Sequence, residues 1–316
     1  MNGSFYQKTA HIAWHAAIFF LVMTALYIGL GRFAASNVSN YSDEILKLLN
    51  VRLPFSLSAR QISGIWRGFG PRVVLTDAVI RLENETVSPI VIEELSFHLK
   101  PILSFLSRSP KFAEVRINNA SLQLLLSGNG LLPSKYFSSD LKYIRHIFSQ
   151  ISSSADLVSL VNNVFEVRTT DGENHPFLLN VEATRRGNHQ TLQTSIALED
   201  DSLLELSTRG TGDLFEPNNY FGQLYFSINL QHQGSTIDLL SKLSHEPFFG
   251  GAHLQAWMDI SPDLLTGLGK IDAQDLVLSY PNNDLKIPSD SASVFIGLEY
   301  VDNEWSISAT DLRVTS

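Results

Sequence analysis

The chain has 316 residues, and its 23 lysines and arginines against 32 aspartates and glutamates give a formal net charge of −9. An acidic chain without a basic block is a poor candidate for a nucleic-acid-binding protein, because phosphate neutralisation supplies most of that affinity. The absence of cysteine excludes disulfides, thiolate zinc sites, iron–sulfur clusters and cysteine nucleophiles. Charged residues make up only 17% of the chain, against about 25% in an ordinary soluble domain, which indicates that part of it faces a medium other than water.

An apolar segment predicts a transmembrane anchor over residues 10–33, after a short cytoplasmic tail of residues 1–9. No Asp, Glu, Lys or Arg occurs from Thr9 to Gly31, close to the roughly 20 residues that a spanning helix needs. Lys8 and Arg32 flank this run and can extend to the headgroups. The apolar side chains expected to face lipid are Ile12, Phe19, Phe20, Leu21, Leu26 and Leu30.

A cleaved signal peptide is the alternative interpretation of this segment. Its apolar region should span about 7–15 residues and end in small residues at positions −3 and −1. The run here is longer, and Phe33 would occupy position −3, so an uncleaved anchor with its N-terminus inside is favoured. His11 and His15 have the i, i+4 spacing of a metal or haem pair, but their place near the headgroups favours no ligand role.

A short amphipathic helix is predicted directly after the anchor. Ser42 is placed to cap it ahead of two acidic residues, and Pro54 to end it. The apolar residues that define its face recur at i, i+4, i+7 and i+8, and they are Tyr41, Ile45, Leu48 and Leu49.

From Pro54 onward the dominant hydrophobic period is two, which is typical of antiparallel strands with one apolar face. Turn signals such as Gly187-Asn188 separate the runs. Strand parity predicts that one set of side chains lines a common apolar face: Leu95, Phe97, Leu99, Leu122, Leu124, Phe177, Leu179, Val181, Ile196, Leu224, Phe226, Ile228, Leu254, Met258, Val294, Ile296 and Leu298.

Two helical patterns interrupt the predicted strands. A helical pair, 141–151 and 157–164, is expected on either side of the serines at 152–154, and a single helix is expected over 237–243. The predicted segments are therefore a first β segment (34–135), a helical insertion (136–165) and a second β segment (166–316). The last residues still have a strand pattern, so we expect the chain to be the front part of a longer protein.

No sequence motif predicts catalysis or a metal or cofactor site. The glycines of residues 64–71 lack the Gly-Lys-Ser/Thr ending of a phosphate loop and instead predict a turn between strands. In this turn Trp66 and Phe69 either pack against protein or contact lipid headgroups. Asp200-Asp201 is expected in a solvated turn rather than at a metal ion, and no nucleophile or zinc-enzyme motif is present.

The order of several stretches resembles the YhdP family, AsmA-like proteins of the Gram-negative inner membrane. The most specific element is Trp-x-x-Phe-Gly-Pro, from Trp66 to Pro71. The other similar stretches are 75–82, 92–99, 112–122, 250–258 and 267–273. Proteins of this family are much longer than 316 residues, so the resemblance covers their N-terminal portion.

The resemblance implies a mainly β fold: a transmembrane helix, then a long curved antiparallel β-sheet groove with a few short amphipathic helices. The groove would be apolar inside and would project from the inner membrane into the periplasm. The family is implicated in moving phospholipids towards the outer membrane, so the implied partners are phospholipids and the inner membrane. No catalytic residue is associated with the family.

A closed β-sandwich has the same strand period, because its apolar faces cover each other. In that alternative the chain is a bitopic scaffold or assembly factor of the cell envelope, and its partners are unidentified envelope proteins. The anchor and the family resemblance favour the groove.

Overall fold

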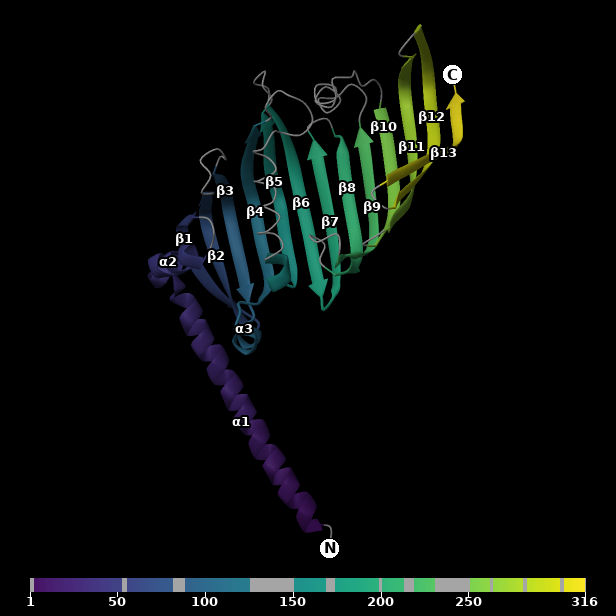
Figure 1. Cartoon of the computed structure of the whole chain (residues 1–316). Coiled ribbons are helices and arrows are strands. Elements are labelled where there is room, and N and C mark those ends of the chain that lie inside the picture. Colours follow the sequence, from purple (N-terminus) through teal and green to yellow (C-terminus); the bar gives the residue numbers. More distant parts are fainter. Residues whose placement is uncertain are drawn as a thin grey trace.

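The computed structural model describes residues 3–52, 56–81, 89–125, 151–168, 174–198, 201–212, 219–230, 251–261, 264–280, 283–301 and 304–315. These residues form a long N-terminal helix and one open, curved sheet of 13 strands (Figure 1). The strands lie in the sheet in the same order as in the chain, from β1 to β13. The predicted fold class, a mainly β protein with an open sheet behind an apolar helix, is therefore confirmed.

The bounds of the elements are as follows. The helices are α1 (Gly3–Ser36), η1 (Val38–Tyr41), α2 (Ser42–Arg52) and α3 (Pro101–Ser107). The strands are β1 (Ser56–Arg67), β2 (Gly70–Arg81), β3 (Ile90–Leu99), β4 (Phe112–Leu125), β5 (Leu157–Arg168), β6 (Asn174–Arg186), β7 (His189–Leu198), β8 (Leu203–Thr211), β9 (Phe221–Leu230), β10 (Gly251–Ile260), β11 (Leu264–Tyr280), β12 (Asn283–Val301) and β13 (Glu304–Thr315).

Helix α1 contains the predicted anchor, and its part from His11 to Ser36 is long and apolar enough to cross a membrane. The six side chains expected to face lipid, Ile12, Phe19, Phe20, Leu21, Leu26 and Leu30, are each more than half exposed. A continuous uncovered apolar surface of this kind is typical of contact with lipid or another protein. The His15 Nδ1 donates to the His11 carbonyl oxygen at 2.7 Å, so this pair makes an ordinary intrahelical hydrogen bond.

Helix α1 lies against the first turn of the sheet. The Trp66 ring packs edge-to-face on the Tyr27 ring, with 5.4 Å between centroids, and a Cβ added at Gly31 would overlap Trp66. The Tyr27 hydroxyl donates to the Phe69 carbonyl oxygen at 2.7 Å. Of the two aromatic residues in the predicted turn, Trp66 therefore packs against α1, while the Phe69 side chain is exposed.

Helices η1 and α2 close the first edge of the sheet. A Cβ added at Gly64 of β1 would overlap the Ala35 carbonyl oxygen, so the glycine permits this crossing. The Asn50 side chain donates to the Leu57 carbonyl oxygen at 2.9 Å and accepts from the Leu57 N–H at 2.6 Å. It thereby satisfies backbone groups at an edge strand, where unpaired groups invite aggregation.

The prediction that Ser42 caps α2 from outside the helix is wrong. Helix η1 runs directly into α2, and Ser42 has helical dihedral angles of −57° and −43°. Its hydroxyl donates to the Ser39 carbonyl oxygen at 3.1 Å. The amphipathic helix itself is confirmed, with Asp43 and Glu44 in its first turn.

The predicted helix over 157–164 is also wrong, because these residues begin β5. The residues that suggested a helix are Leu157, Leu160, Val161 and Val164. In the structure Asn162 has a φ of 55°, and the register between β5 and β6 shifts between Leu160 and Asn163. This irregularity breaks the alternation of a strand and produces apparent helical spacing. The run is also rich in β-branched residues, which favour strands.

Strand β5 pairs with β4 in parallel, whereas every other pair in the described sheet is antiparallel. A parallel pair needs a crossover connection, commonly one that contains a helix. Residues 151–154 are helical and lie just before β5. The remaining predicted helical residues, 141–150 and 237–243, lie outside the described residues.

Candidate functional site

The register of the strands assigns every predicted lining residue to one face of the sheet, here named the apolar face, because directly paired residues point to the same side. Strand β3 contributes Leu95, Phe97 and Leu99; β4 contributes Leu122 and Leu124; β6 contributes Phe177, Leu179 and Val181; β7 contributes Ile196; β9 contributes Leu224, Phe226 and Ile228; β10 contributes Leu254 and Met258; and β12 contributes Val294, Ile296 and Leu298.

One row of directly paired residues, the central row, crosses all 13 strands on this face. Its members are Ile62, Leu75, Leu95, Ile117, Leu160, Val181, Thr194, Leu206, Phe226, Ala256, Gly269, Ile296 and Ala309. Only Thr194 carries a polar side chain. The central row is therefore apolar across the described sheet except at Thr194.

Asp and Asn residues with left-handed backbone keep the alternation in phase. Asp77, Asn119, Asn162 and Asp311 have φ values from 49° to 55°. These two residue types tolerate the left-handed region better than other non-glycine residues. Asn162 and Asp311 lie beside register shifts, whereas Asp77 and Asn119 lie at unpaired positions within an unshifted register. In each case the left-handed residue returns the apolar residues that follow to the same face.

Burial divides the apolar face into a closed part and a half-open part. Among the described residues, every buried Leu, Ile and Val belongs to β1–β5. From β6 onward the described Leu, Ile, Val, Met and Phe side chains on this face are only half-buried or exposed, and the buried apolar members are alanines and Tyr220. Within the part of the chain that the structure describes, packed protein thus covers the apolar face at its first strands.

The closed part has its own core. Val38 of η1 and Ile45 and Leu46 of α2 pack against a buried cluster that includes Leu75 and Leu95. A second cluster joins β4 and β5, and the members of this cluster are Val115, Ala155, Val158 and Leu160, with Ile151 packed beside them. Of the predicted lining residues, Leu95 and Leu122 are buried in this closed part, whereas those from Phe177 on lie in the half-open part.

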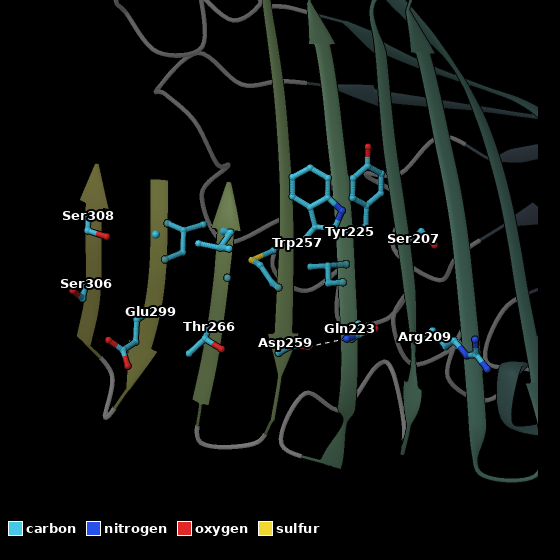
Figure 2. Close-up of a pocket in the computed structure, with 16 residues that line it drawn as sticks. Ser207, Arg209, Gln223, Tyr225, Trp257, Asp259, Thr266, Glu299, Ser306 and Ser308 are labelled. Carbon is cyan, nitrogen blue, oxygen red and sulfur yellow. Dashed lines mark hydrogen bonds between the residues drawn. The ribbon is translucent and has the colours of Figure 1, made fainter. Parts of the chain in front are cut away.

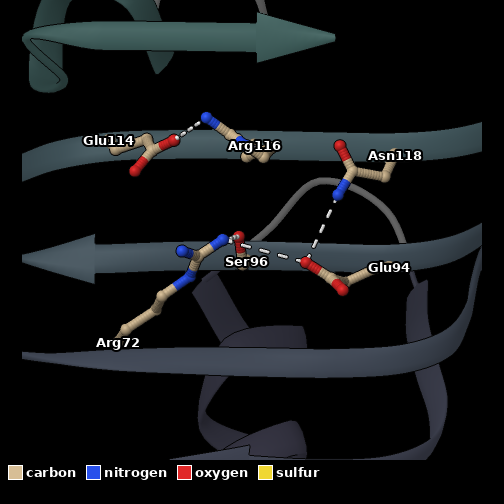
Figure 3. Close-up of polar contacts among 6 residues, drawn as sticks. All are labelled: Arg72, Glu94, Ser96, Glu114, Arg116 and Asn118. Carbon is tan, nitrogen blue, oxygen red and sulfur yellow. Dashed lines mark hydrogen bonds and ion pairs between the residues drawn. The ribbon is translucent and has the colours of Figure 1, made fainter. Parts of the chain in front are cut away.

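The opposite face, here named the polar face, is built from charged and amide side chains over β2–β4 (Figure 3). The Arg72 guanidinium donates to Ser96 Oγ at 2.9 Å and lies 3.8 Å from Glu94 Oε1. Asn118 Nδ2 donates to the same Glu94 oxygen at 3.3 Å. These contacts satisfy polar groups on this face over β2–β4. Later strands place exposed apolar side chains on the same face, and these are Leu178, Trp257, Leu268 and Phe295.

Over β8–β13 the polar face holds a hollow of about 730 Å³ (Figure 2). Tyr225 and Trp257 form part of its wall, with ring centroids 5.4 Å apart. Its ionisable lining side chains are Arg209, Asp259 and Glu299. A smaller hollow of about 470 Å³ lies on the same face over β5–β9. Most residues that line the two hollows belong to the polar face, but the predicted lining residues Leu224, Met258 and Leu298 also border the larger hollow and Val181 borders the smaller one.

Tyr220 covers the end of the apolar face at β8 and β9 and is 2% exposed. The Thr208 hydroxyl donates to the Gln223 carbonyl oxygen at 2.9 Å, so the Tyr220 hydroxyl donates to Thr208 Oγ1, at 2.6 Å. Burial raises the pKa of Tyr220 above its ordinary value, because the phenolate would lose its hydration.

Among the described residues no group of three or more His, Asp or Glu side chains could hold a metal ion.

The sequence did not predict strand β8 or helix α3. Leu204 and Leu206 of β8 lie on the apolar face and alternate with Glu205 and Ser207, which is a usable strand signal. In α3, Pro101 at the first helical position precedes the apolar residues, a favourable helix start.

The comparisons with known proteins agree with the fold. The family model described as "YhdP protein" matches residues 1–316. No curated protein and no solved structure matches the chain.

Proposed function

Because the chain belongs to the YhdP family, we propose that it is an inner-membrane-anchored conduit that holds phospholipid acyl chains on its apolar face and passes them towards the outer membrane. Membership of this family and an apolar N-terminal helix fit a membrane-anchored envelope protein without enzymatic activity. The bulk of the chain would then lie in the periplasm.

The observation that carries the proposal is the half-open apolar face of β6–β13. A phospholipid that leaves a bilayer exposes two long acyl chains, at a cost on the order of 20–25 kcal/mol at about 0.8 kcal/mol per methylene. Apolar side chains that remain partly uncovered can replace the bilayer as the environment of these chains. Since transfer needs no bond to form or break, it requires only a continuous row of mainly apolar side chains, and the central row has one polar member, Thr194.

The dimensions of the sheet agree with a path for lipid. Thirteen strands leave twelve spacings of about 4.8 Å, so the central row is roughly 58 Å long. The half-open part from β6 to β13 has seven of these spacings, roughly 34 Å. This length exceeds an extended acyl chain, so a bound lipid would have to move along the row from strand to strand.

The experiment that tests this proposal compares adjacent residues on opposite faces. A photoreactive benzoylphenylalanine replaces Phe226 or Ile296 on the apolar face, and Tyr225 or Phe295 on the polar face serves as the matched control. We expect phospholipid adducts at 226 and 296 and few or none at 225 and 295. Equal labelling on both faces, or no lipid at any position, would overturn the proposal and favour a scaffold of the cell envelope.

A functional version of the same comparison uses charge. Phe226→Asp and Ile296→Asp should block lipid transfer while the chain still folds, because a carboxylate interrupts the apolar row. Tyr225→Asp and Phe295→Asp should leave transfer near the wild-type rate. Circular dichroism of the purified variants separates loss of transfer from loss of folding.

A further inference from the structure

Helix α3 turns its apolar side chains away from the protein. Ile102, Leu103, Phe105 and Leu106 are between 49% and 84% exposed. The residue that faces the protein is Ser104, whose hydroxyl donates to the Lys100 carbonyl oxygen at 2.8 Å and accepts from the Lys111 N–H at 2.9 Å. A helix on the surface of a soluble protein has the opposite arrangement, with its apolar side packed and its polar side exposed.

The turn between β1 and β2 extends this exposed surface. Phe69 at its tip is 68% exposed. A Cβ added at Gly70 would overlap the Leu99 carbonyl oxygen and would lie 3.3 Å from Pro101 Cδ, so the turn and the start of α3 are in contact. Both lie at the end of the sheet from which α1 extends (Figure 1).

The contact between α1 and the β1–β2 turn indicates how far this exposed surface lies from the membrane that α1 would span. The Phe69 carbonyl oxygen accepts a hydrogen bond from Tyr27, which lies within the apolar stretch His11–Ser36. The charge-free run ends at Gly31, and Arg32 follows it, so about 20 spanning residues that end near Leu30 fit the sequence best. Tyr27 is then three residues, about 4.5 Å along the helix, inside the membrane–water boundary, and the turn beside it lies close to that boundary.

The charges around the surface complement anionic lipid. Residues 95–113 include Lys100, Arg108 and Lys111 and no acidic residue, in a chain with a net charge of −9. Arg67 adds a further cation in the β1–β2 turn. Lys100 forms an ion pair with Asp156, whereas Arg108 and Lys111 follow α3 and have no ion pair among the described residues.

We propose that α3 and the β1–β2 turn form a second membrane contact, in which Phe69, Phe105 and Leu106 enter the headgroup–acyl boundary of the bilayer that α1 spans. The occupant is a lipid surface that contains anionic phospholipid, and the cations that flank α3 lie among its headgroups. This contact rests on membrane anchoring by α1 and does not depend on lipid transport. It would hold the first strands against the bilayer, which a single helix cannot do.

The lack of cysteine in the chain gives a direct test, because one introduced cysteine can be labelled uniquely. Phe105→Cys in the full-length chain carries an environment-sensitive fluorophore, and the protein is placed in nanodiscs of phosphatidylethanolamine and phosphatidylglycerol at about 7:3. Lipids with a spin label near the headgroup quench any fluorophore at the boundary. Phe20→Cys in α1 is the membrane control, and Leu268→Cys, also 68% exposed but on β11, is the control outside the membrane.

We expect blue-shifted emission at position 105 and at least threefold stronger quenching by the spin-labelled lipid than at position 268. Quenching should decrease about twofold or more in nanodiscs of phosphatidylcholine alone, because the anionic headgroups are missing. Quenching equal to that at position 268 would overturn the proposal. Blue-shifted emission without lipid quenching would also overturn it, since protein and not lipid would then cover α3.

Discussion

At the scale of single residues, close contacts fix how the anchor joins the sheet. Gly64 lies on the apolar face of β1, where a Cβ would overlap the Ala35 carbonyl oxygen and would lie within 3 Å of Val38 side-chain atoms. A backbone oxygen cannot rotate aside as a side chain can. The position therefore requires glycine for steric reasons, although glycine is otherwise unfavourable in a strand.

We expect Gly64→Ala to destabilise the chain by roughly 1–3 kcal/mol, because the extra carbon forces α1 away from β1. Gly29→Ala is the matched control, since a Cβ at Gly29 meets nothing within 4 Å. Denaturant unfolding of both variants in the same detergent measures the difference. Equal midpoints for the two variants would show that α1 does not pack on β1 as described.

The raised pKa of Tyr220 predicts that the folded chain loses stability at alkaline pH. Its pKa is raised in the folded chain, so the unfolded chain releases this proton at lower pH than the folded chain does. The contribution to stability is complete below the unfolded pKa of about 10 and is lost as the pH rises through the folded pKa. In Tyr220→Phe this titration is absent, and the free energy of unfolding should decrease less than that of wild type between about pH 9 and pH 11. Parallel pH curves for the two proteins would contradict the prediction.

At the scale of elements, the parallel pair β4–β5 depends on one buried amide. Asn163 is 0% exposed, and its Oδ1 accepts from the Ala120 N–H at 2.9 Å across the two strands. The pairing of these strands is irregular beside Asn119 and Asn162, so this side chain replaces a missing backbone partner.

Asn163→Ala should destabilise the chain by roughly 1–3 kcal/mol, because the Ala120 N–H would be buried without an acceptor. Asn162→Gly at the neighbouring position should be neutral or slightly stabilising, since Asn162 is exposed and has a φ of 55° that glycine adopts readily. Urea unfolding of both variants checks this contrast. The prediction fails if the two substitutions have the same effect.

The sequence predicted the elements whose hydrophobic period is regular and missed those where it is not. Helix α2 and the strands around Phe97, Phe177, Phe226 and Ile296 follow from an undisturbed spacing of apolar residues. Strand β5 was misassigned because the left-handed Asn162 shifts its alternation by one residue. Tertiary position, and not local pattern, determines such an irregularity, so a single sequence cannot place it.

Strand parity predicts which side chains share a face of the sheet. The register places the predicted lining residues on one face, and their role in a lipid groove stays a prediction. Parity does not show which part of that face is covered by other elements. Leu95 and Phe226 have the same strand pattern, yet Leu95 is buried in a cluster against which η1 and α2 pack, whereas Phe226 is only half-buried.

At the scale of the whole molecule, the sheet is close to one-dimensional, since each strand pairs only with its neighbours along the chain. In such an architecture, stability is approximately a sum of contributions from units and their interfaces, and it can differ from one end to the other. The buried Leu, Ile and Val of the described residues are all at the β1–β5 end.

We therefore expect graded hydrogen exchange of the full chain. Backbone amides of β2–β4 should be the most protected, because they combine two paired neighbours with a packed core. Those of β13 should be the least protected, because β13 pairs only with β12 within the described sheet and its side chains at 306–315 are exposed. Mass spectrometry of peptides from nanodisc-embedded protein measures this gradient, and uniform protection from β2 to β13 would argue for a single cooperative unit.

The match between strand order and chain order has a consequence for biogenesis. A chain that is threaded through a translocation channel emerges in sequence, and here each new strand finds its partner already folded at the growing edge. Helix α1 precedes the sheet in the chain, and the strands beside it are those with the largest buried core. Assembly can therefore begin at the strands next to α1 and proceed in the order of synthesis, without any strand waiting for a distant part of the chain.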